Sequence, residues 1–288
     1  MTEQMAYGTR MTIGGNPMEF KSHSIKQTID LSEDDGLRGV RSRVLERVAQ
    51  GLIHVAGQIE FEPTPAEVAI LLPLIVSDST TDTVLTDTMA DVTIVIDNGT
   101  KTDTFVGRFA KATFSGSSGQ KIRLTVDFIG KTRSSSAGGS LSGVPDITSR
   151  PYMFHDMGSG ITIGGTAYSV DKFELTIDNH IEPTFMQGQV ATDLEPTDRT
   201  VSLGVQTKYT PTEDALLVLA TAGPVLGAPL AASIAFTNGA NSMSFSFGAI
   251  VAESESVVNQ GKRTKLRLPL YYHCYKVGTT LETVPVLV

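Results

Sequence analysis

Two stretches of the chain, Thr64-Pro65-Ala66-Glu67 and Thr210-Pro211-Thr212-Glu213, have the form Thr-Pro-x-Glu, and each is followed by an apolar run. Threonine as N-cap, proline at the first helical position and glutamate at the third together form a capping box, which marks the start of a helix. The first box predicts a short helix over Ala66–Leu72 that Pro73 bends or ends, and the second predicts a helix beginning at Pro211. Because the first helix is strongly apolar, it is expected to pack against a sheet.

Other short motifs occur in both halves of the chain in the same order, at separations between 140 and 150 residues. Separations that vary only by the length of the intervening loops indicate a duplication. The chain is therefore predicted to contain two copies of one unit, domain 1 over residues 1–131 and domain 2 over residues 151–288. Residues 132–150 are interpreted as a flexible linker, because residues 132–144 are rich in Ser and Gly and show no periodicity. The paired motifs are Thr12–Gly15 with Thr162–Gly165, Thr28–Asp30 with Thr176–Asp178, the two capping boxes, Asn98-Gly99 with Asn238-Gly239, and Lys121–Leu124 with Lys265–Leu268.

Apolar and polar residues alternate through much of the remaining chain, and this pattern predicts strands. Residues 11–31 are expected to form a hairpin, because Thr12–Pro17 has turn chemistry and Ile25–Leu31 alternates. The fold class is therefore mainly β, with one helix in each copy. Further strands are predicted at Ile53–Glu62, Val92–Ile96, Phe105–Phe114, Lys121–Phe128, Tyr168–Asp178 and Thr200–Tyr209, with three more within Ala232–Tyr275.

Composition excludes several classes of protein. The net charge of −8 argues against a nucleic-acid reader, which presents a basic stripe, but it suits a surface that nucleic acid passes without sticking. The single Cys274 excludes an intrachain disulfide framework and favours assembly in a reducing compartment. No apolar run approaches about 18 residues, which predicts no membrane contact, and Met1–Arg10 lacks the apolar core of a signal peptide.

A long polar loop lies between two early strands of each copy, at residues 32–50 and again at residues 182–199. The first loop is rich in Arg, whereas the second is rich in acidic side chains, so the two loops have opposite charge. Long loops in compact domains are often functional. The alternative is a solvated loop, which in the first copy would end in a short helix over residues 43–50. The charged side chains are Arg38, Arg41, Arg43 and Arg47 in the first loop and Glu182, Asp193, Glu195 and Asp198 in the second.

The sequence has no residue pattern typical of catalysis or of metal or cofactor binding. The five His residues form no metal-ligand spacing with one another, with Cys or with a carboxylate. His273 and Cys274 are neighbours on a predicted strand and therefore point to opposite faces, which does not suit a nucleophilic pair. The Gly residues at 158–165 do not lead from a strand into a helix and are interpreted as turns. We therefore expect no enzymatic activity, no cofactor and no metal site.

The stretch Gly57–Glu67, which runs into Leu71-Leu72, resembles the tail tube proteins of long-tailed bacteriophages. Asp178-Asn179, the segment Thr197–Arg199 and the closing strand of each half are similar to the same family, and the resemblance covers about residues 10–276. It implies a β-sandwich or small barrel with one flanking α-helix, so that the chain would hold two such domains in tandem. It also implies that six domains form a ring, and that rings stack into the tube through which DNA is ejected. The long loop of each domain would reach the neighbouring ring.

The two copies in this chain lead to a prediction of the ring's composition. Three chains would supply six domains and give a trimeric ring with pseudo-sixfold symmetry. The alternative is a ring of six chains with the second domain outside. The Arg-rich and acid-rich loops are then candidates for contacts between rings or subunits, and the lumen is expected to be negative or neutral, because DNA binds basic surfaces strongly.

The resemblance implies a protein of the virion tail, assembled in the cytoplasm of a bacterial host. Its expected partners are further copies of itself and the tape measure, tail terminator and distal tail proteins, while double-stranded DNA passes through the lumen without specific binding. Two other functions stay open. A distal tail or hub protein would form one ring instead of many. A non-viral β-sandwich binding module, such as a carbohydrate-binding protein, would need an aromatic platform, whereas the chain has no Trp and only 7% aromatic residues.

Overall fold

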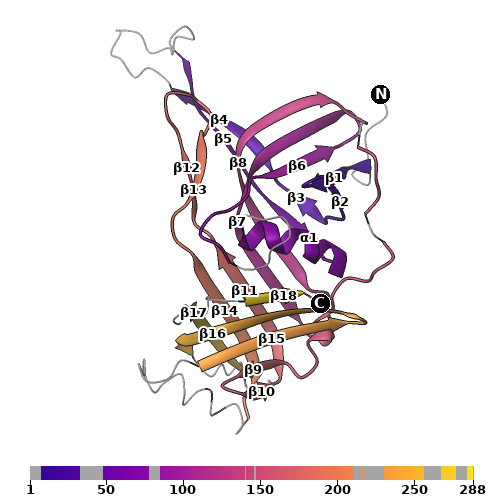
Figure 1. Ribbon diagram of the computed structural model, residues 1–288, viewed down its shortest axis with the longest axis vertical. Coiled ribbons are helices and arrows are strands. Elements are labelled where there is room, and N and C mark those ends of the chain that lie inside the picture. The colour runs from indigo at the N-terminus through magenta and orange to yellow at the C-terminus, as the bar shows by residue number, and fades with distance from the viewer. Residues whose placement is uncertain are drawn as a thin grey trace, which may run out of the picture.

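The computed structural model describes residues 8–32, 48–77, 85–139, 141–145, 147–210, 214, 216, 230–255, 267–276 and 284–287. In this part of the chain the fold is mainly β, with one sheet of 16 strands and a separate two-stranded sheet (Figure 1). The first half of the chain forms most of the upper part of Figure 1 and the second half forms the lower part, except that β12 and β13 lie at the upper left; the helix α1 is in front of the sheet near its middle.

The elements follow one another along the chain in a mostly antiparallel arrangement. The first half contains β1 (Arg10–Ile13), β2 (Asn16–Met18), β3 (Ser22–His23), β4 (Lys26–Ser32), β5 (Ala49–Phe61), α1 (Pro65–Val76), β6 (Val92–Asp97), β7 (Lys101–Ser117) and β8 (Arg123–Ala137). A short 3-10 turn, Phe154–Met157, opens the second half. It is followed by β9 (Ile161–Ile163), β10 (Thr166–Tyr168), β11 (Val170–Asp178), β12 (Ile181–Thr184), β13 (Asp193–Pro196), β14 (Thr200–Lys208), β15 (Leu230–Asn238), β16 (Asn241–Glu255), β17 (Arg267–Tyr275) and β18 (Val284–Leu287).

The two halves arrange their strands in the same spatial order. In the first half, hydrogen-bonded neighbours run β4-β5-β8-β7-β6-β1-β2, with β3 also on β5. In the second half they run β11-β14-β17-β16-β15-β9-β10, with β18 also on β16. Strand β11 is therefore the counterpart of β4, and β16 is the counterpart of β7. By register Thr28 corresponds to Asp178, so the match of Thr28–Asp30 with Thr176–Asp178 was wrong by two residues. The two runs become one sheet because β11 also pairs with β7.

Strand β7 joins the halves because it is long enough to have two partners along one edge. That edge pairs with β6 from Thr102 to Gly107 and then with β11 from Lys111 to Ser117. The opposite edge pairs with β8, with a β-bulge between Phe109 and Lys111. Strand β16 has a register shift at the corresponding point, between Ala252 and Ser254.

The helix α1 begins at the first capping box. The Thr64 side chain accepts a hydrogen bond from the Glu67 backbone N–H at 3.3 Å, and the Glu67 carboxylate accepts one from the Thr64 N–H at 2.9 Å. The helix runs past its predicted end at Leu72 and continues through Pro73 to Val76. Proline removes one helical hydrogen bond, yet the last turn places Leu74, Ile75 and Val76 in the core, and this burial outweighs the loss.

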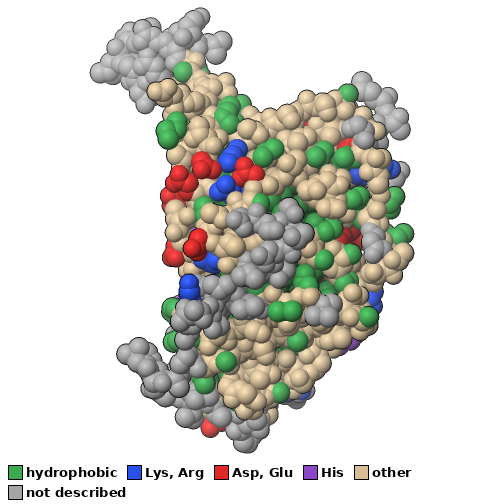
Figure 2. Space-filling model, viewed as in Figure 1, with side chains coloured by type: hydrophobic (Ala, Val, Ile, Leu, Met, Phe, Trp, Pro, Cys, Tyr) green, Lys and Arg blue, Asp and Glu red, His purple; other side chains and the backbone are tan. Residues whose placement is uncertain are grey.

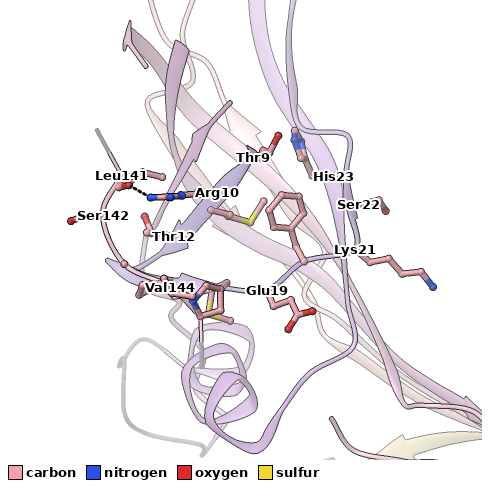
Figure 3. A pocket seen from close by; sticks show the side chains of 16 residues that line it. Thr9, Arg10, Thr12, Glu19, Lys21, Ser22, His23, Leu141, Ser142 and Val144 are labelled. Atoms are coloured by element: carbon pink, nitrogen blue, oxygen red, sulfur yellow. Dashed lines mark hydrogen bonds between the residues drawn. The ribbon is translucent and has the colours of Figure 1, made fainter. Parts of the chain in front are cut away.

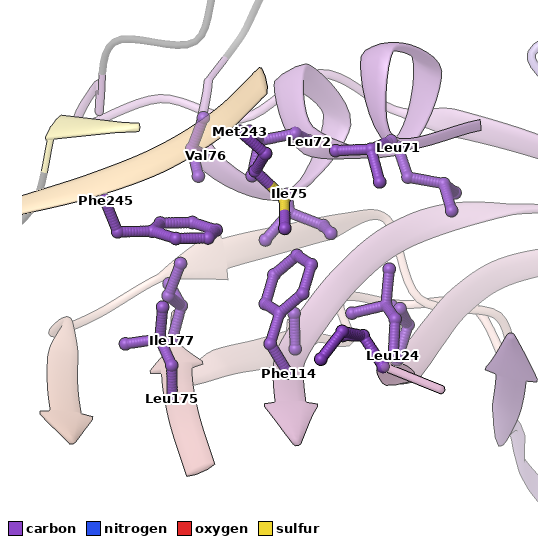
Figure 4. Packing of buried hydrophobic residues seen from close by; sticks show 14 of the residues in the cluster. Leu71, Leu72, Ile75, Val76, Phe114, Leu124, Leu175, Ile177, Met243 and Phe245 are labelled. Atoms are coloured by element: carbon purple, nitrogen blue, oxygen red, sulfur yellow. The ribbon is translucent and has the colours of Figure 1, made fainter. Parts of the chain in front are cut away.

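The hydrophobic core is common to both halves. Leu71 and Ile75 of α1 face Phe114 of β7, while Ile177 of β11 and Phe245 of β16 approach the same place from the second half (Figure 4). All five side chains are at most 1% exposed. The two halves therefore share one sheet and one large apolar cluster in the described part of the chain.

The sequence prediction for residues 11–31 was only partly right. The turn at Gly14-Gly15 does connect two antiparallel strands, β1 and β2. The alternating stretch after it does not fold back on them, because β4 pairs with β5 instead. Strand β5 passes so close to the residues just before β4 that a Cβ atom on Gly57 would lie 2.3 Å from the Ile25 Cα, so only glycine fits there.

The predicted linker begins later than its composition indicated. Residues 132–137 continue β8 and pair with residues 101–106 of β7. Backbone hydrogen bonds to β7 are enough to hold this Ser-rich segment as a strand. Its composition therefore wrongly predicted a flexible linker. Beyond it, the Asp97 carboxylate accepts hydrogen bonds from the N–H groups of Gly139 and Leu141 at 2.9 and 3.2 Å. This part of the chain is therefore anchored to the first half.

The second capping box lies mostly outside the described residues. Pro211 and Glu213 are not described, whereas Asp214 and Leu216 are helical and the Asp214 N–H donates to the Thr210 carbonyl at 2.9 Å. Among the described helices, none is both long and apolar enough to cross a membrane.

Candidate functional site: assembly surfaces

One face of the central sheet is lined by polar side chains. Alternate residues of β5, β8, β7, β11, β14 and β17 enter the core, and the residues between them lie on the opposite face. A row of hydroxyl side chains crosses four of these strands in register, and the hydroxyl oxygens of Thr113 and Thr176 lie 3.3 Å apart across the junction between the halves. The members of the row are Thr125, Thr113, Thr176 and Ser202. We call this surface the polar sheet face.

A second row on the polar sheet face alternates in charge. Gln58 donates a hydrogen bond to the Asp127 carboxylate at 2.8 Å, and Asp127 is in register with Lys111. Lys111 is in turn in register with Asp178, and the charged atoms of this pair are 4.0 Å apart. Each acidic side chain in the row therefore has a cation or an amide group beside it.

The polar sheet face is close to neutral overall. Arg123 forms an ion pair with Glu60 at 2.8 Å across β8 and β5. A surface on which cations and anions neutralise one another neither binds a polyanion strongly nor repels it strongly. The basic residues in register on this face are Lys111, Arg123, Lys172, Lys208 and Arg267, and the acidic ones are Glu60, Asp127, Glu174 and Asp178.

The acid-rich loop of the second half forms a hairpin, β12 with β13. Figure 1 shows the hairpin beside the arm formed by β4 and β5. The Ile53 N–H donates to the Gln189 carbonyl at 2.8 Å, and the Gln189 side chain donates to the Gln50 carbonyl at 2.7 Å. The rings of His54 and Phe185 add an edge contact with centroids 5.2 Å apart. The end of the first predicted loop therefore lies beside the middle of the second within one chain.

Asp193 pairs with cations of the same chain, while 51% of its side chain stays exposed. It lies 3.2 Å from Lys131 and 3.7 Å from Arg108, and Asp91 lies 2.8 Å from each of the same two cations. The Leu194 N–H and then the Lys131 ammonium lower the pKa of Asp193 below its usual value. Figure 2 shows acidic and basic side chains gathered beside the hairpin. This ion network fastens the second half to β7 and β8.

The other acidic residues of the hairpin are placed differently. Glu182 and Glu195 face each other across β12 and β13, and both are exposed. Like charges in this position repel each other, so a cationic partner would relieve the repulsion. Asp198 is exposed and accepts a hydrogen bond from the Arg199 N–H at 2.8 Å. The proposed partners Arg38, Arg41, Arg43 and Arg47 lie outside the described residues.

Sequence reasoning gave no individual role to Asn179 and Arg199. Asn179 is buried and donates to the carbonyl oxygens of Ile75 and Phe109 at 3.0 and 3.3 Å. Arg199 donates to the Asn179 side chain at 3.1 Å and also to the Thr86 carbonyl. These contacts fix the end of α1 and strand β7 to the second half. The only signal in the sequence was that both residues fall within the segments that resemble the tail tube family.

An open groove of about 710 Å³ lies where residues 141–145 cross the β1–β2 hairpin (Figure 3). Arg10 donates to the Leu141 carbonyl at 2.8 Å and holds this crossing in place. Burial lowers the pKa of His23 at the far side of the groove. Among the residues that the structure describes, no group of three or more His, Cys, Asp or Glu side chains is placed to hold a metal ion.

A mainly β chain with one polar sheet face and a docked, charged hairpin has the features of a structural assembly protein. The family model for phage tail tube proteins matches residues 2–269, and the chain belongs to this family. A search of curated proteins finds no match. Membership of the family supports a structural, non-enzymatic role in the tail of a virion, with self-assembly and contacts to other tail components.

Proposed function

We propose that this protein is the repeating subunit of a phage tail tube, assembled in the host cytoplasm, and that its stacked rings form the conduit for DNA ejection. The family match over residues 2–269 carries the proposal. Expected partners are further copies of the chain and the tape measure, tail terminator and distal tail proteins.

The polar sheet face supports a role as the wall of the lumen. DNA carries dense negative charge and binds to basic surfaces through its phosphates. On this face Lys111 lies between Asp127 and Asp178, and Arg123 pairs with Glu60, so few cations remain for phosphate. Such a wall would let the duplex slide through the tube without specific binding.

The shared strand order of the two halves supports a duplicated chain. Both halves place seven strands in the same sequence of neighbours, and both have a register shift at the same point of the long strand. We therefore propose two tail-tube-like units, corresponding to residues 1–131 and 151–288, in each chain. Three chains would complete a ring of six units with pseudo-sixfold symmetry.

The hairpin residues Glu182 and Glu195 are proposed to contact a neighbouring ring or subunit. They are exposed, adjacent and of like charge, which suits a basic partner such as the loop that carries Arg41 and Arg43. The exposed Asp198 and the half-exposed Asp193, which also pairs with Lys131 and Arg108 within the chain, belong to the same proposed contact surface.

Negative-stain electron microscopy of the purified protein tests the proposed function. Hollow tubes with a regular ring repeat are expected, and native mass spectrometry of isolated rings should give the mass of three chains. Rings that never stack at any concentration would instead indicate a hub protein at the tail tip. Monomers under all conditions, including with the other tail proteins present, would contradict the tube function.

A further inference from the structure

The polar sheet face is close to neutral as a whole, but its charges are unevenly distributed. Away from the turn that joins β7 to β8, Lys111 lies in register between Asp127 and Asp178. Close to that turn cations predominate, and an open groove of about 560 Å³ brings four of them together from three parts of the chain. We call it the basic groove, and its cations are Lys21, Lys121, Arg123 and Lys172.

Three of these cations share two carboxylates. Glu62 lies 3.4 Å from Lys21 and also pairs with Lys121. Glu60 lies 2.8 Å from Arg123. The carboxylates therefore leave an excess of positive charge beside the groove, and a phosphate group is an anion that such cations bind well.

Lys172 is the fourth cation, and its neighbours in register carry no charge. It is exposed and lies between Ser117 on β7 and Gln206 on β14. Ser117 also lines the basic groove, where its hydroxyl group can donate a hydrogen bond to an anion. The groove therefore combines positive charge with a neutral donor, which suits the backbone of a nucleic acid.

A smaller hollow of about 140 Å³ adjoins the basic groove, and Lys172 lines both. A Cβ atom on Gly204 would lie 3.2 Å from the Cε1 of Tyr271, so the missing side chain lets the Tyr271 ring lie against β14. The residue is nonetheless 54% exposed. Gln206 and Glu174 also line the hollow, so hydrogen-bonding groups lie beside an exposed aromatic ring.

Two further rings follow Tyr271 along the same strand. Tyr271, His273 and Tyr275 occupy alternate positions of β17, and the residues between them, Tyr272 and Cys274, are buried. The three rings therefore lie on one face of the sheet. The ring centroids of His273 and Tyr275 are 6.4 Å apart. We call these three residues the aromatic stripe.

We propose that the aromatic stripe and the basic groove together form a binding site for single-stranded nucleic acid. Proteins that bind single strands combine a positively charged groove for the phosphates with aromatic side chains on which bases stack. Here bases stack on Tyr271 and its neighbours in the stripe, while Lys172 and Arg123 contact phosphate groups. Four strand spacings, or about 19 Å, separate the β17 row from Arg123, so a strand of a few nucleotides reaches both.

The site distinguishes a single strand from a duplex. In a duplex each base is covered by its stacked neighbours, so its flat faces do not reach the aromatic stripe. Duplex DNA therefore passes this face, whereas an unpaired end is held by stacking. The inference goes beyond the proposed function and rests on it only for the position of the site inside the conduit.

Fluorescence anisotropy with a labelled oligothymidylate of about 12 nucleotides tests the site on the full-length protein, with a duplex of equal length for comparison. The single strand should bind about tenfold more tightly than the duplex at low salt. Tyr271→Ala should weaken this binding about tenfold, whereas Tyr271→Phe, which keeps a ring, should bind like the unmodified protein.

The cationic part of the site is tested separately. Lys172→Ala should weaken binding and lower the slope of its salt dependence by about one. The matched control is Lys101→Ala, which removes an exposed cation at the opposite end of β7 and should leave binding unchanged. Circular dichroism and electron microscopy should show that all variants fold and assemble like the unmodified protein.

The other outcomes each overturn one proposal. Equal binding of single strand and duplex, unchanged in Tyr271→Ala, would mean that only phosphate attraction operates. Tubes that bind no oligonucleotide would overturn the site and leave the tube function standing. Loss of assembly in Tyr271→Ala would assign the aromatic stripe to a contact between subunits and overturn the site. Oligonucleotide binding by a protein that never forms rings or tubes would overturn the tube function and leave the site standing.

Discussion

The rings of Phe114 on β7 and Phe245 on β16 lie with their centroids 5.2 Å apart, and each side chain comes from a different half of the chain. Both are buried among side chains of α1 and β11 (Figure 4). A core that the halves share couples their stability, because neither half keeps its apolar surface covered when the other unfolds.

Replacing Phe245 with alanine should therefore destabilise the whole chain. Removing a buried aromatic ring costs about 3–5 kcal/mol, and a shared core should keep unfolding in a single transition. Urea denaturation followed by circular dichroism measures both effects. Val286→Ala, at a residue that is 42% exposed, is the control and should change little. Two separate transitions, with the first half unaffected by Phe245→Ala, would show that the halves fold independently.

Asp193→Asn should loosen the β12–β13 hairpin without unfolding the sheet. Lys131 and Arg108 would lose one of their two acidic partners, since Asp91 remains. Hydrogen exchange in residues 181–196 should become faster while the melting temperature stays nearly constant. The matched control is Glu195→Gln, which changes an exposed carboxylate in the same hairpin. Unchanged exchange in Asp193→Asn would mean that backbone pairing alone holds the hairpin.

The same contact should depend on pH in a definite direction. The pKa of Asp193 is lower in the folded chain than in the unfolded chain, where it is about 3.9. The stability that Asp193 adds to the hairpin is therefore fully present above the unfolded-state pKa. This stability is lost as the pH falls through the lower pKa that Asp193 has in the folded chain. Exchange in the hairpin, corrected for intrinsic rates, should therefore rise below about pH 4 in the unmodified protein and rise less in Asp193→Asn. An equal rise in both proteins would assign the acid response to other groups.

Reversing acidic charges on the polar sheet face should turn a passive wall into a DNA-binding one. Asp127→Lys with Asp178→Lys would leave Lys111 among cations instead of anions. Assembled tubes of this variant should bind duplex DNA about tenfold more tightly at low salt than unmodified tubes, with the gain lost at high salt. Asp87→Lys, at an exposed site in the segment between α1 and β6, is the control. Equal binding by the two variants would place the lumen elsewhere.

Reversing Glu182 and Glu195 to Lys should impair the stacking of rings while leaving single rings intact. Both carboxylates are exposed and adjacent on the hairpin, so the change alters charge without removing a core contact. Electron microscopy should show short stacks or isolated rings. Adding Arg41→Glu and Arg43→Glu should restore tubes if the two loops meet. Long tubes from the Glu182 and Glu195 variant alone would exclude the hairpin from the contact between rings.

Local features of the fold were predictable from the sequence because they depend on neighbouring residues. The start of α1 follows from Thr64 and Glu67, which are three residues apart and complete each other's hydrogen bonds. Strands such as β14 follow from strict alternation of buried and exposed residues. The order of the strands in the sheet was not predicted, because contacts between distant parts of the chain determine which strands become neighbours.

The features that the sequence did not predict depend on distant contacts. The last turn of α1 survives Pro73 because Ile75 and Val76 are fully buried beneath the rest of the molecule. The Asn179 side chain meets the Ile75 carbonyl across 104 residues, and Asp193 meets Lys131 across more than 60. Such contacts leave no periodic pattern in the sequence, so a charged loop residue could not be recognised as part of an internal ion network.

The β7–β11 junction has a consequence for the kinetics of assembly. Because both strands belong to one chain, this contact forms at the effective concentration set by the tether and not at the concentration of the protein. In the proposed ring, three molecules would bring six units together, whereas a ring of six separate units would require six molecules to meet. The rate of ring formation should then depend less steeply on protein concentration than it would for single-unit chains. Tubes could therefore begin to grow at a lower concentration of the subunit.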